Sequence, residues 1–215
     1  MPHVNPALEP SYWEEAKQHL RRDSILARLM DDYPDSILRS HGDPFRTLVK
    51  AILGQQVSVA SAQSLWNRLL ALCPDDGLHP VPLLALEDEQ LRLCGISRQK
   101  RLYLSHLSTF FLPSERRSID YWNDCTDAEV MQHLTSIKGI GRWSAEMFLI
   151  FCVQRPDIFP VRDIGLQRAL ARYYGITAKP FDVERAELLA QSWQPYRTVA
   201  LWYLWRALDP IEVQY

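Results

Sequence analysis

Two glycines that stand one residue apart, Gly139 and Gly141, interrupt a helical pattern and have cationic neighbours at Lys138 and Arg142. A turn built from glycines lacks the Cβ atoms that would shield its backbone. Its N–H groups, with the positive end of the helix that follows, then point outward and suit a phosphate group. Such a contact is made through the backbone and carries no sequence preference. The same Gly-x-Gly spacing is also typical of a plain structural turn between helices.

The four cysteines do not form a metal-binding pattern. They are Cys73, Cys94, Cys125 and Cys152, separated by 21, 31 and 27 residues, and no Cys-x-x-Cys pair occurs. This spacing argues against a cysteine-based zinc or iron–sulfur site. A chain of 215 residues is long enough to build its own core, so the scattered thiols indicate reduced cysteines in a cytosolic environment.

The overall charge gives no indication of a polyanionic partner. Lys and Arg number 24 against 26 Asp and Glu, for a net charge of −2. Binding to nucleic acid therefore needs a local basic face. Residues 92–117 hold six Lys and Arg against one acid, a net +5, and suggest such a face. A solvated helix surface is the alternative.

The composition is that of a globular chain, with 47% apolar and 23% charged residues. The longest apolar runs, such as Met147–Val153, are too short for a membrane helix. No charged-then-apolar leader opens the chain. We therefore expect neither a secreted protein nor a membrane protein.

The elements that position these residues are predicted to be helices, because apolar residues recur at intervals of three and four. Capping patterns mark two helix starts: Asp43 followed by Pro44, and Thr126 followed by Glu129. No stretch alternates with period two, so the fold is predicted to be all-α. The helices are expected over residues 44–54, 58–73, 86–94, 97–111, 126–137, 142–153, 164–174, 183–191 and 195–208, with a loop over 74–82.

Several segments, in order along residues 40–208, resemble the 3-methyladenine DNA glycosylase II family of the helix-hairpin-helix base-excision DNA glycosylase superfamily. The hairpin segment 134–145 is followed by a Pro-containing loop and by Asp163, which stands 20 residues after Trp143. That spacing matches the alkylpurine branch. Longer members carry an additional N-terminal β-rich domain, so this chain is similar to the compact form. The other matching segments are Phe45–Ala62, Gly95–Ser97 with Lys100, and Trp193–Arg197 with Trp202–Trp205.

The resemblance implies an all-α fold of two helical subdomains. Residues 42–160 are expected to form a central subdomain that holds a DNA-wedging loop and the helix-hairpin-helix. Residues 1–41 and 161–215 are expected to pair as the second subdomain. An active-site cleft with Asp163 is expected between the two.

The resemblance assigns the chemistry to Asp163. Loss of a base from deoxyribose builds positive charge on the sugar, and a fixed carboxylate stabilises that oxocarbenium-like state. The same carboxylate can orient or deprotonate the attacking water. A merely structural role as the cap of the helix that starts at Ile164 is the alternative, and the two roles are compatible because a helix N-terminus favours negative charge.

Most glycoside hydrolysis needs a second carboxyl group to protonate the leaving group, and no second acid is singled out here. An alkylated purine such as 3-methyladenine or 7-methylguanine already carries positive charge and leaves without that help. A single aspartate therefore fits an enzyme for alkylated purines.

Trp143 stands where the lyase branches of the superfamily place a lysine nucleophile. Tryptophan cannot form a Schiff base, so a monofunctional glycosylase is expected. The resemblance implies that Trp143 and Trp205 line the pocket for the extruded base. An indole there can make a cation–π contact of about 0.5–2 kcal/mol with the positively charged base. Packing in the core is the alternative for both. Met147 and Ile164 replace aromatic residues of relatives, which leaves the pocket's shape and the substrate range open.

The remaining residues that the resemblance singles out concern DNA and a cation. Gln56 falls at the inserting position of the wedge loop, where it would fill the gap left by the extruded base; a polar turn is the alternative. Backbone carbonyls of Thr135, Ile137 and Ile140 are expected to bind a monovalent cation, Na⁺ or K⁺. The expected contacts with DNA phosphates come from Lys138, Gly139, Gly141, Arg142 and Ser144.

The function expected from the resemblance is removal of alkylated purines from duplex DNA, the first step of base-excision repair. No redox or organic cofactor is implied, and the family suggests a monomer. Such a protein would act at the nucleoid in the cytoplasm of a bacterium or in the nucleus of a eukaryote. Two alternatives stay open: a bifunctional glycosylase and AP lyase, and a non-catalytic helix-hairpin-helix module that only binds DNA.

Overall fold

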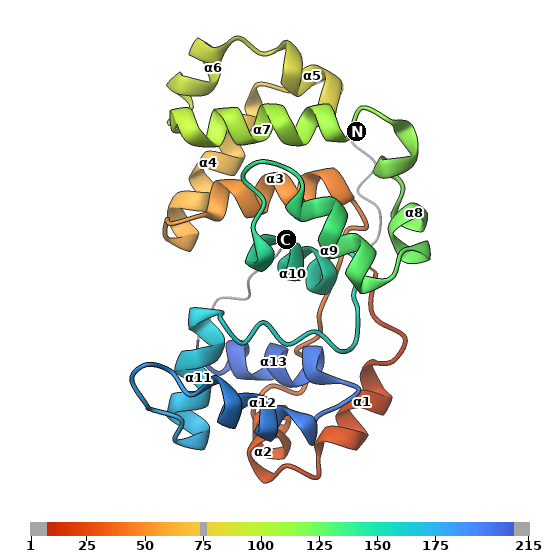
Figure 1. Ribbon diagram of the computed structural model, residues 1–215, viewed down its shortest axis with the longest axis vertical. Coiled ribbons are helices and arrows are strands. Elements are labelled where there is room, and N and C mark those ends of the chain that lie inside the picture. Colours follow the sequence, from red (N-terminus) through yellow and green to blue (C-terminus); the bar gives the residue numbers. More distant parts are fainter. Residues whose placement is uncertain (1–7, 74–76, 209–215) are drawn as a thin grey trace. The chain divides into compact units, whose positions relative to one another are not determined.

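The computed structural model describes residues 8–73 and 77–208. These residues form thirteen α-helices and one 3-10 helix and contain no strand, which confirms the predicted all-α class (Figure 1). None of these helices has the length and apolar composition needed to cross a bilayer. The described residues fall into two compact units: residues 40–153 form unit 1, and residues 8–39 with 154–208 form unit 2.

Unit 1 is organised around α3, which contacts α4, α7 and α10. The helix begins as its sequence predicts: the Asp43 Oδ1 accepts the N–H of Arg46 at 2.9 Å, and Pro44 occupies the first turn. Its Leu48 and Ile52 side chains are fully buried. The helices of unit 1 are α3 (Pro44–Gly54), α4 (Val59–Ala71), α5 (Pro80–Ala85), α6 (Asp88–Leu93), α7 (Arg98–Phe110), α8 (Ile119–Asp124), α9 (Asp127–Thr135) and α10 (Arg142–Phe151), with a 3-10 helix at Ser114–Arg117.

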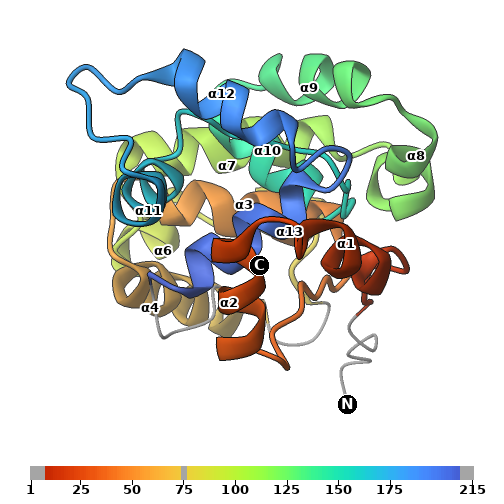
Figure 2. The same cartoon turned by 90° about the horizontal axis from the view of Figure 1, so that it is seen from below.

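Unit 2 is organised around α13, which contacts α1, α2 and α11 (Figures 1 and 2). Residues 198–204 of α13 are all buried, so this helix forms the core of the unit. The helices of unit 2 are α1 (Trp13–Leu20), α2 (Ser24–Asp32), α11 (Ile164–Tyr174), α12 (Val183–Gln191) and α13 (Arg197–Arg206).

Asp23 is one of the residues that connect the two chain segments of unit 2. The Asp23 Oδ1 caps α2 by accepting the N–H groups of Ile25 and Leu26. Its Oδ2 accepts the Tyr174 hydroxyl at 2.9 Å and the Trp193 indole N–H at 3.0 Å. The segment before residue 40 is therefore hydrogen-bonded to the segment after residue 153.

One sequence prediction for unit 1 is wrong, and two short elements were not predicted. The predicted loop over 74–82 ends early, because α5 begins at Pro80. Proline fits the first position of a helix, because an N–H group there would have no hydrogen-bond acceptor within the helix. Residues 74–76 of that loop lie outside the described residues. The helix predicted over 97–111 ends as expected, since α7 stops at Phe110. The 3-10 helix and α8 that follow are not among the predicted helices, because they are too short to show a helical period.

Candidate active site

The hairpin between α9 and α10 exposes its backbone. Gly139 has a φ of +100°, in the region that favours glycine. Gly141 is the N-cap of α10, is exposed, and supplies no side-chain cap. The first N–H groups of an α-helix have no acceptor within the helix. The start of α10 therefore has the donors and the positive dipole end that suit an anion.

Charged side chains flank this turn. Lys138 is exposed, and the Arg142 side chain is 73% exposed while its Nε donates to the Glu146 carboxylate at 2.8 Å. Ser144, also predicted to contact DNA, is only 3% exposed. This residue is therefore buried in unit 1, unlike Lys138 and Arg142.

The predicted wedge loop follows α3 and is braced from two sides. Gln56 is exposed and has a left-handed φ of 57°. The Lys100 Nζ donates to the Leu53 carbonyl at 2.6 Å, just before the loop, and burial lowers the pKa of this ammonium. The Gln55 Nε2 donates to the Gly139 carbonyl at 2.9 Å. The loop is thus tied both to α7 and to the hairpin turn.

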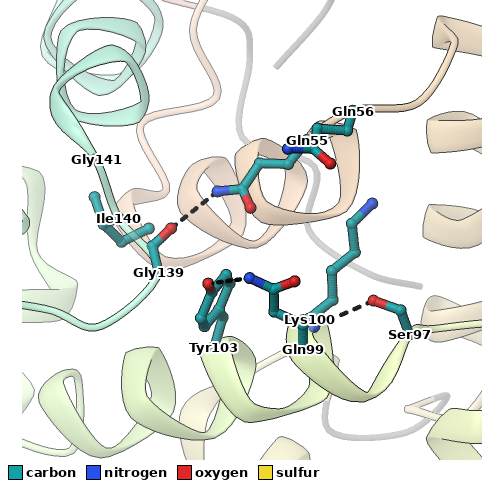
Figure 3. A pocket seen from close by; sticks show the side chains of 9 residues that line it. All are labelled: Gln55, Gln56, Ser97, Gln99, Lys100, Tyr103, Gly139, Ile140 and Gly141. Carbon is teal, nitrogen blue, oxygen red and sulfur yellow. Dashed lines mark hydrogen bonds between the residues drawn. The ribbon is translucent and has the colours of Figure 1, made fainter.

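A polar hollow of about 420 Å³ lies where the wedge loop, the start of α7 and the hairpin turn meet. Figure 3 shows Gln55 reaching the Gly139 carbonyl on one side and Gln99 bonded to the Tyr103 hydroxyl on the other. The predicted wedge and the predicted phosphate-binding turn therefore border the same hollow. Its lining residues are Gln55, Gln56, Ser97, Gln99, Lys100, Tyr103, Gly139, Ile140 and Gly141.

Replacing Gln55 with alanine removes the hydrogen bond between the wedge loop and the hairpin. We expect the free energy of unfolding to fall by about 0.5–1.5 kcal/mol, the usual net contribution of one such bond. Gln63→Ala is the matched control, because its amide bonds to Asn67 on the exposed face of α4. Urea denaturation of both variants measures the difference, and equal losses would show that the brace contributes no stability.

Asp163 and Trp205 lie together in unit 2. Asp163 is the N-cap of α11: its Oδ1 accepts the N–H of Leu166 at 2.7 Å. The same Oδ1 accepts the indole N–H of Trp205, from α13, at 2.9 Å. Asp163 and Trp205 are both half-buried. The carboxylate is therefore held in place by two N–H donors while part of it stays exposed.

The other predicted pocket residues are distributed over both units. Trp143 lies in the first turn of α10, in unit 1, and is half-buried. Met147, one turn further along, is 2% exposed, so it belongs to the core of unit 1. Ile164 follows Asp163 in unit 2 and is 63% exposed, an unusual environment for a large apolar side chain.

The basic face suggested over residues 92–117 is partly neutralised by acids outside that segment. Arg92 pairs with Glu89 at 2.5 Å, and Arg101 pairs with Asp88 at 2.6 Å. Asp88 and Glu89 lie just before residues 92–117, so they are not included in the net charge of +5. Lys100 and Arg116, from the same segment, donate to the backbone carbonyls of Leu53 and Phe110.

The described residues contain no group of three or more His, Cys, Asp or Glu side chains that could hold a metal ion. The predicted cation ligands are instead backbone carbonyls of the hairpin. The Ile137 carbonyl accepts the Ile140 N–H at 3.0 Å, which leaves it a second lone pair. These oxygens are chemically suited to a monovalent cation.

Comparison with known proteins gives one family match and many related sequences. The model of the HhH-GPD superfamily of base excision DNA repair proteins matches residues 49–195. The alkylbase DNA glycosidase-like protein mag2 of Schizosaccharomyces pombe is 31% identical over 91% of this chain and 94% of its own length. DNA-3-methyladenine glycosylase 1 of the same organism is 30% identical over 84% of this chain and 79% of its own length.

The similar solved structures include 3-methyladenine DNA glycosylases. The DNA-3-methyladenine glycosidase of Bacillus halodurans superposes with a TM-score of 0.75 and 32% identity, over 94% of this chain and 92% of that one. The 3-methyladenine DNA glycosylase of Schizosaccharomyces pombe, in complex with abasic DNA, gives a TM-score of 0.78 and 25% identity, over 89% of this chain and 95% of that one.

Proposed function

Because this chain belongs to the HhH-GPD superfamily of base excision DNA repair proteins, we propose that it is a DNA glycosylase that hydrolyses the N-glycosidic bond of alkylated purines in duplex DNA. The names of its relatives support this substrate class. The observation that carries the chemistry is the Asp163 carboxylate, which is held at the start of α11 by the N–H groups of Leu166 and Trp205.

In the proposed reaction, Asp163 stabilises the positive charge that develops on the sugar as the base departs. A carboxylate that is already oriented costs no reorganisation at the moment of reaction, which is why such groups contribute strongly to catalysis. Asp163 also orients the water that attacks the C1′ carbon. The water supplies the hydroxyl group of the abasic sugar, and its proton leaves through the carboxylate.

One carboxylate is enough for this substrate class. An alkylated purine carries its positive charge before the bond breaks, so the electron pair of the glycosidic bond neutralises the departing base. No second acid is then required to protonate it, unlike most glycoside hydrolysis. In this proposal Trp143 stacks on the electron-poor base through a cation–π contact.

The proposed DNA contacts lie in unit 1. The exposed backbone of Gly139 and Gly141 binds a phosphate group, with Lys138 and Arg142 beside it, and Gln56 fills the gap that the extruded base leaves. Ser144 adds its backbone N–H alone. The reaction uses only water, so any cation at the hairpin carbonyls is structural. The protein is proposed to act as a monomer where its genome lies, at the bacterial nucleoid or in the nucleus.

The proposal is tested by incubating the protein with DNA that has been treated with a methylating agent and identifying the released bases by chromatography. Free 3-methyladenine or 7-methylguanine is the expected product, with the DNA strand left uncut at the abasic site. A protein that binds the duplex but releases no base would be a DNA-binding module instead.

The bifunctional alternative is tested on the same DNA with sodium borohydride. A lyase forms a Schiff base with the sugar, and borohydride reduces that intermediate to a covalent protein–DNA adduct. We expect no adduct, because position 143 is tryptophan and not lysine. An adduct that Lys138→Ala abolishes would contradict the monofunctional proposal.

A further inference from the structure

The geometry points to Trp205 as a positioning residue that acts on Asp163 through its indole N–H, and to Gly165 as the residue whose missing side chain allows that contact. This inference rests on the proposed function, because it concerns the carboxylate proposed to stabilise the sugar cation. It assigns Trp205 a role other than the wall of the base pocket.

The first argument is the arrangement of donors around the carboxylate. The Asp163 Oδ1 accepts both the Leu166 N–H at 2.7 Å and the Trp205 Nε1–H at 2.9 Å. One donor comes from the same helix cap and the other from α13, 42 residues further along. A single hydrogen bond leaves a carboxyl group free to rotate about that bond. Two donors from separate helices restrain the Asp163 Oδ1 from two directions.

The second argument is that Trp205 is suited to hold a charge in one orientation. Its Nε1–H can donate a hydrogen bond but cannot accept one, so it interacts favourably with an ionised carboxylate. A hydrogen bond to a charged acceptor is stronger than one between neutral groups. Trp205 is carried by α13, whose residues 198–204 are buried in the core of unit 2, so the backbone that positions the indole N–H is held by packing.

The third argument is Gly165, which occupies the first turn of α11. Its backbone does not have a positive φ, so conformation alone does not require glycine. A Cβ at this position would lie 3.0 Å from the Asp163 Oδ1, 3.0 Å from the Trp205 Nε1 and 3.2 Å from the Trp205 Cδ1. The missing side chain leaves the space in which the carboxylate and the indole edge meet.

Glycine within a helix is disfavoured by roughly 0.5–1 kcal/mol relative to alanine. At three other glycines, Gly54, Gly141 and Gly175, a Cβ would meet nothing within 4 Å. At Gly165 the three nearest atoms that a Cβ would meet belong to Asp163 and Trp205.

The test is the single-turnover rate of 7-methylguanine release from duplex DNA by Trp205→Phe, which keeps an aromatic ring but loses the N–H. We expect the rate to fall by about 10- to 100-fold, the effect of losing a hydrogen bond to a charged group. The dissociation constant for a duplex with an uncleavable abasic-site analogue should change by less than about twofold, because stacking and phosphate contacts remain. A loss confined to DNA affinity would overturn the proposal in favour of the pocket-wall role.

Trp202→Phe is the matched control. Trp202 lies on the same helix, is 5% exposed, and donates its indole N–H to the Ser36 hydroxyl at 2.9 Å. This variant removes the same donor from the same core but leaves Asp163 untouched. Its rate should stay within about twofold of the wild type. Equal rate losses in the two variants would show a general effect on unit 2 and would overturn the proposal.

A double-mutant cycle separates positioning from mere structure. In the Asp163→Asn background, Trp205→Phe should change the residual rate by less than about twofold, because the carboxylate that Trp205 positions is gone. Additive losses would contradict the proposed coupling. Gly165→Ala should lower the wild-type rate, because its Cβ would lie 3.0 Å from both the Asp163 Oδ1 and the Trp205 Nε1. If the wild-type protein releases no base at all, the proposed function itself fails.

Discussion

Replacing Asp163 with asparagine is expected to lower the single-turnover rate of base release from methylated duplex DNA by at least about 100-fold, as removal of a preorganised charge-stabilising group does in other enzymes. Asparagine keeps an oxygen that can accept the Leu166 N–H, so the cap of α11 survives. The variant should therefore fold and bind duplex DNA like the wild type. Chromatography of the released base measures the rate, and a filter-binding or anisotropy assay measures the affinity.

The matched control is Asp182→Asn. Asp182 caps α12 in the same unit by accepting the N–H of Arg185 at 3.0 Å. The same chemical change at this cap should leave the rate within about twofold of the wild type. If Asp163→Asn retains wild-type activity, Asp163 is a helix cap only and the proposed mechanism is wrong.

A second large effect is expected from Gly139→Ala. Alanine at a φ of +100° is strained, and its Cβ would overlap the Tyr103 ring that packs against this turn. We expect the free energy of unfolding to fall by about 2–4 kcal/mol from the combined strain and overlap. Chemical denaturation followed by circular dichroism measures this loss, and the affinity for duplex DNA should fall with the disturbed turn.

Gly141→Ala provides the contrast within the same turn. Its φ is −91° and a Cβ there meets nothing within 4 Å. This variant should lose less than about 0.5 kcal/mol of stability, as surface substitutions usually do. Adding Tyr103→Ala to Gly139→Ala should restore part of the lost stability by removing the overlap. Equal stability of the two glycine variants would mean that Tyr103 does not restrict the turn.

The features predicted correctly from the sequence are those that local chemistry determines. The capping box of Thr126 and Glu129 forms with both of its hydrogen bonds. α11 spans the predicted residues 164–174 and ends at Gly175, which is left-handed. Each of these depends on residues within one or two turns of one another, so a single sequence contains the required information.

The features that were missed depend on contacts between distant residues. The local sequence does not mark Gly165 as a position where a side chain would clash, because glycine is tolerated within a helical pattern. Its neighbour in space, Trp205, lies 40 residues away in the sequence. Asp88 and Glu89 neutralise arginines that were counted without them. Pro80 was interpreted as a breaker, but it begins a helix.

The discontinuity of unit 2 has a consequence for biosynthesis. The residues of unit 1 are synthesised as one continuous segment. Asp23, in unit 2, can form its hydrogen bonds with Tyr174 and Trp193 only after those residues have been synthesised. Domains generally fold as units during translation, so unit 2 can complete its fold only after nearly the whole chain has been synthesised.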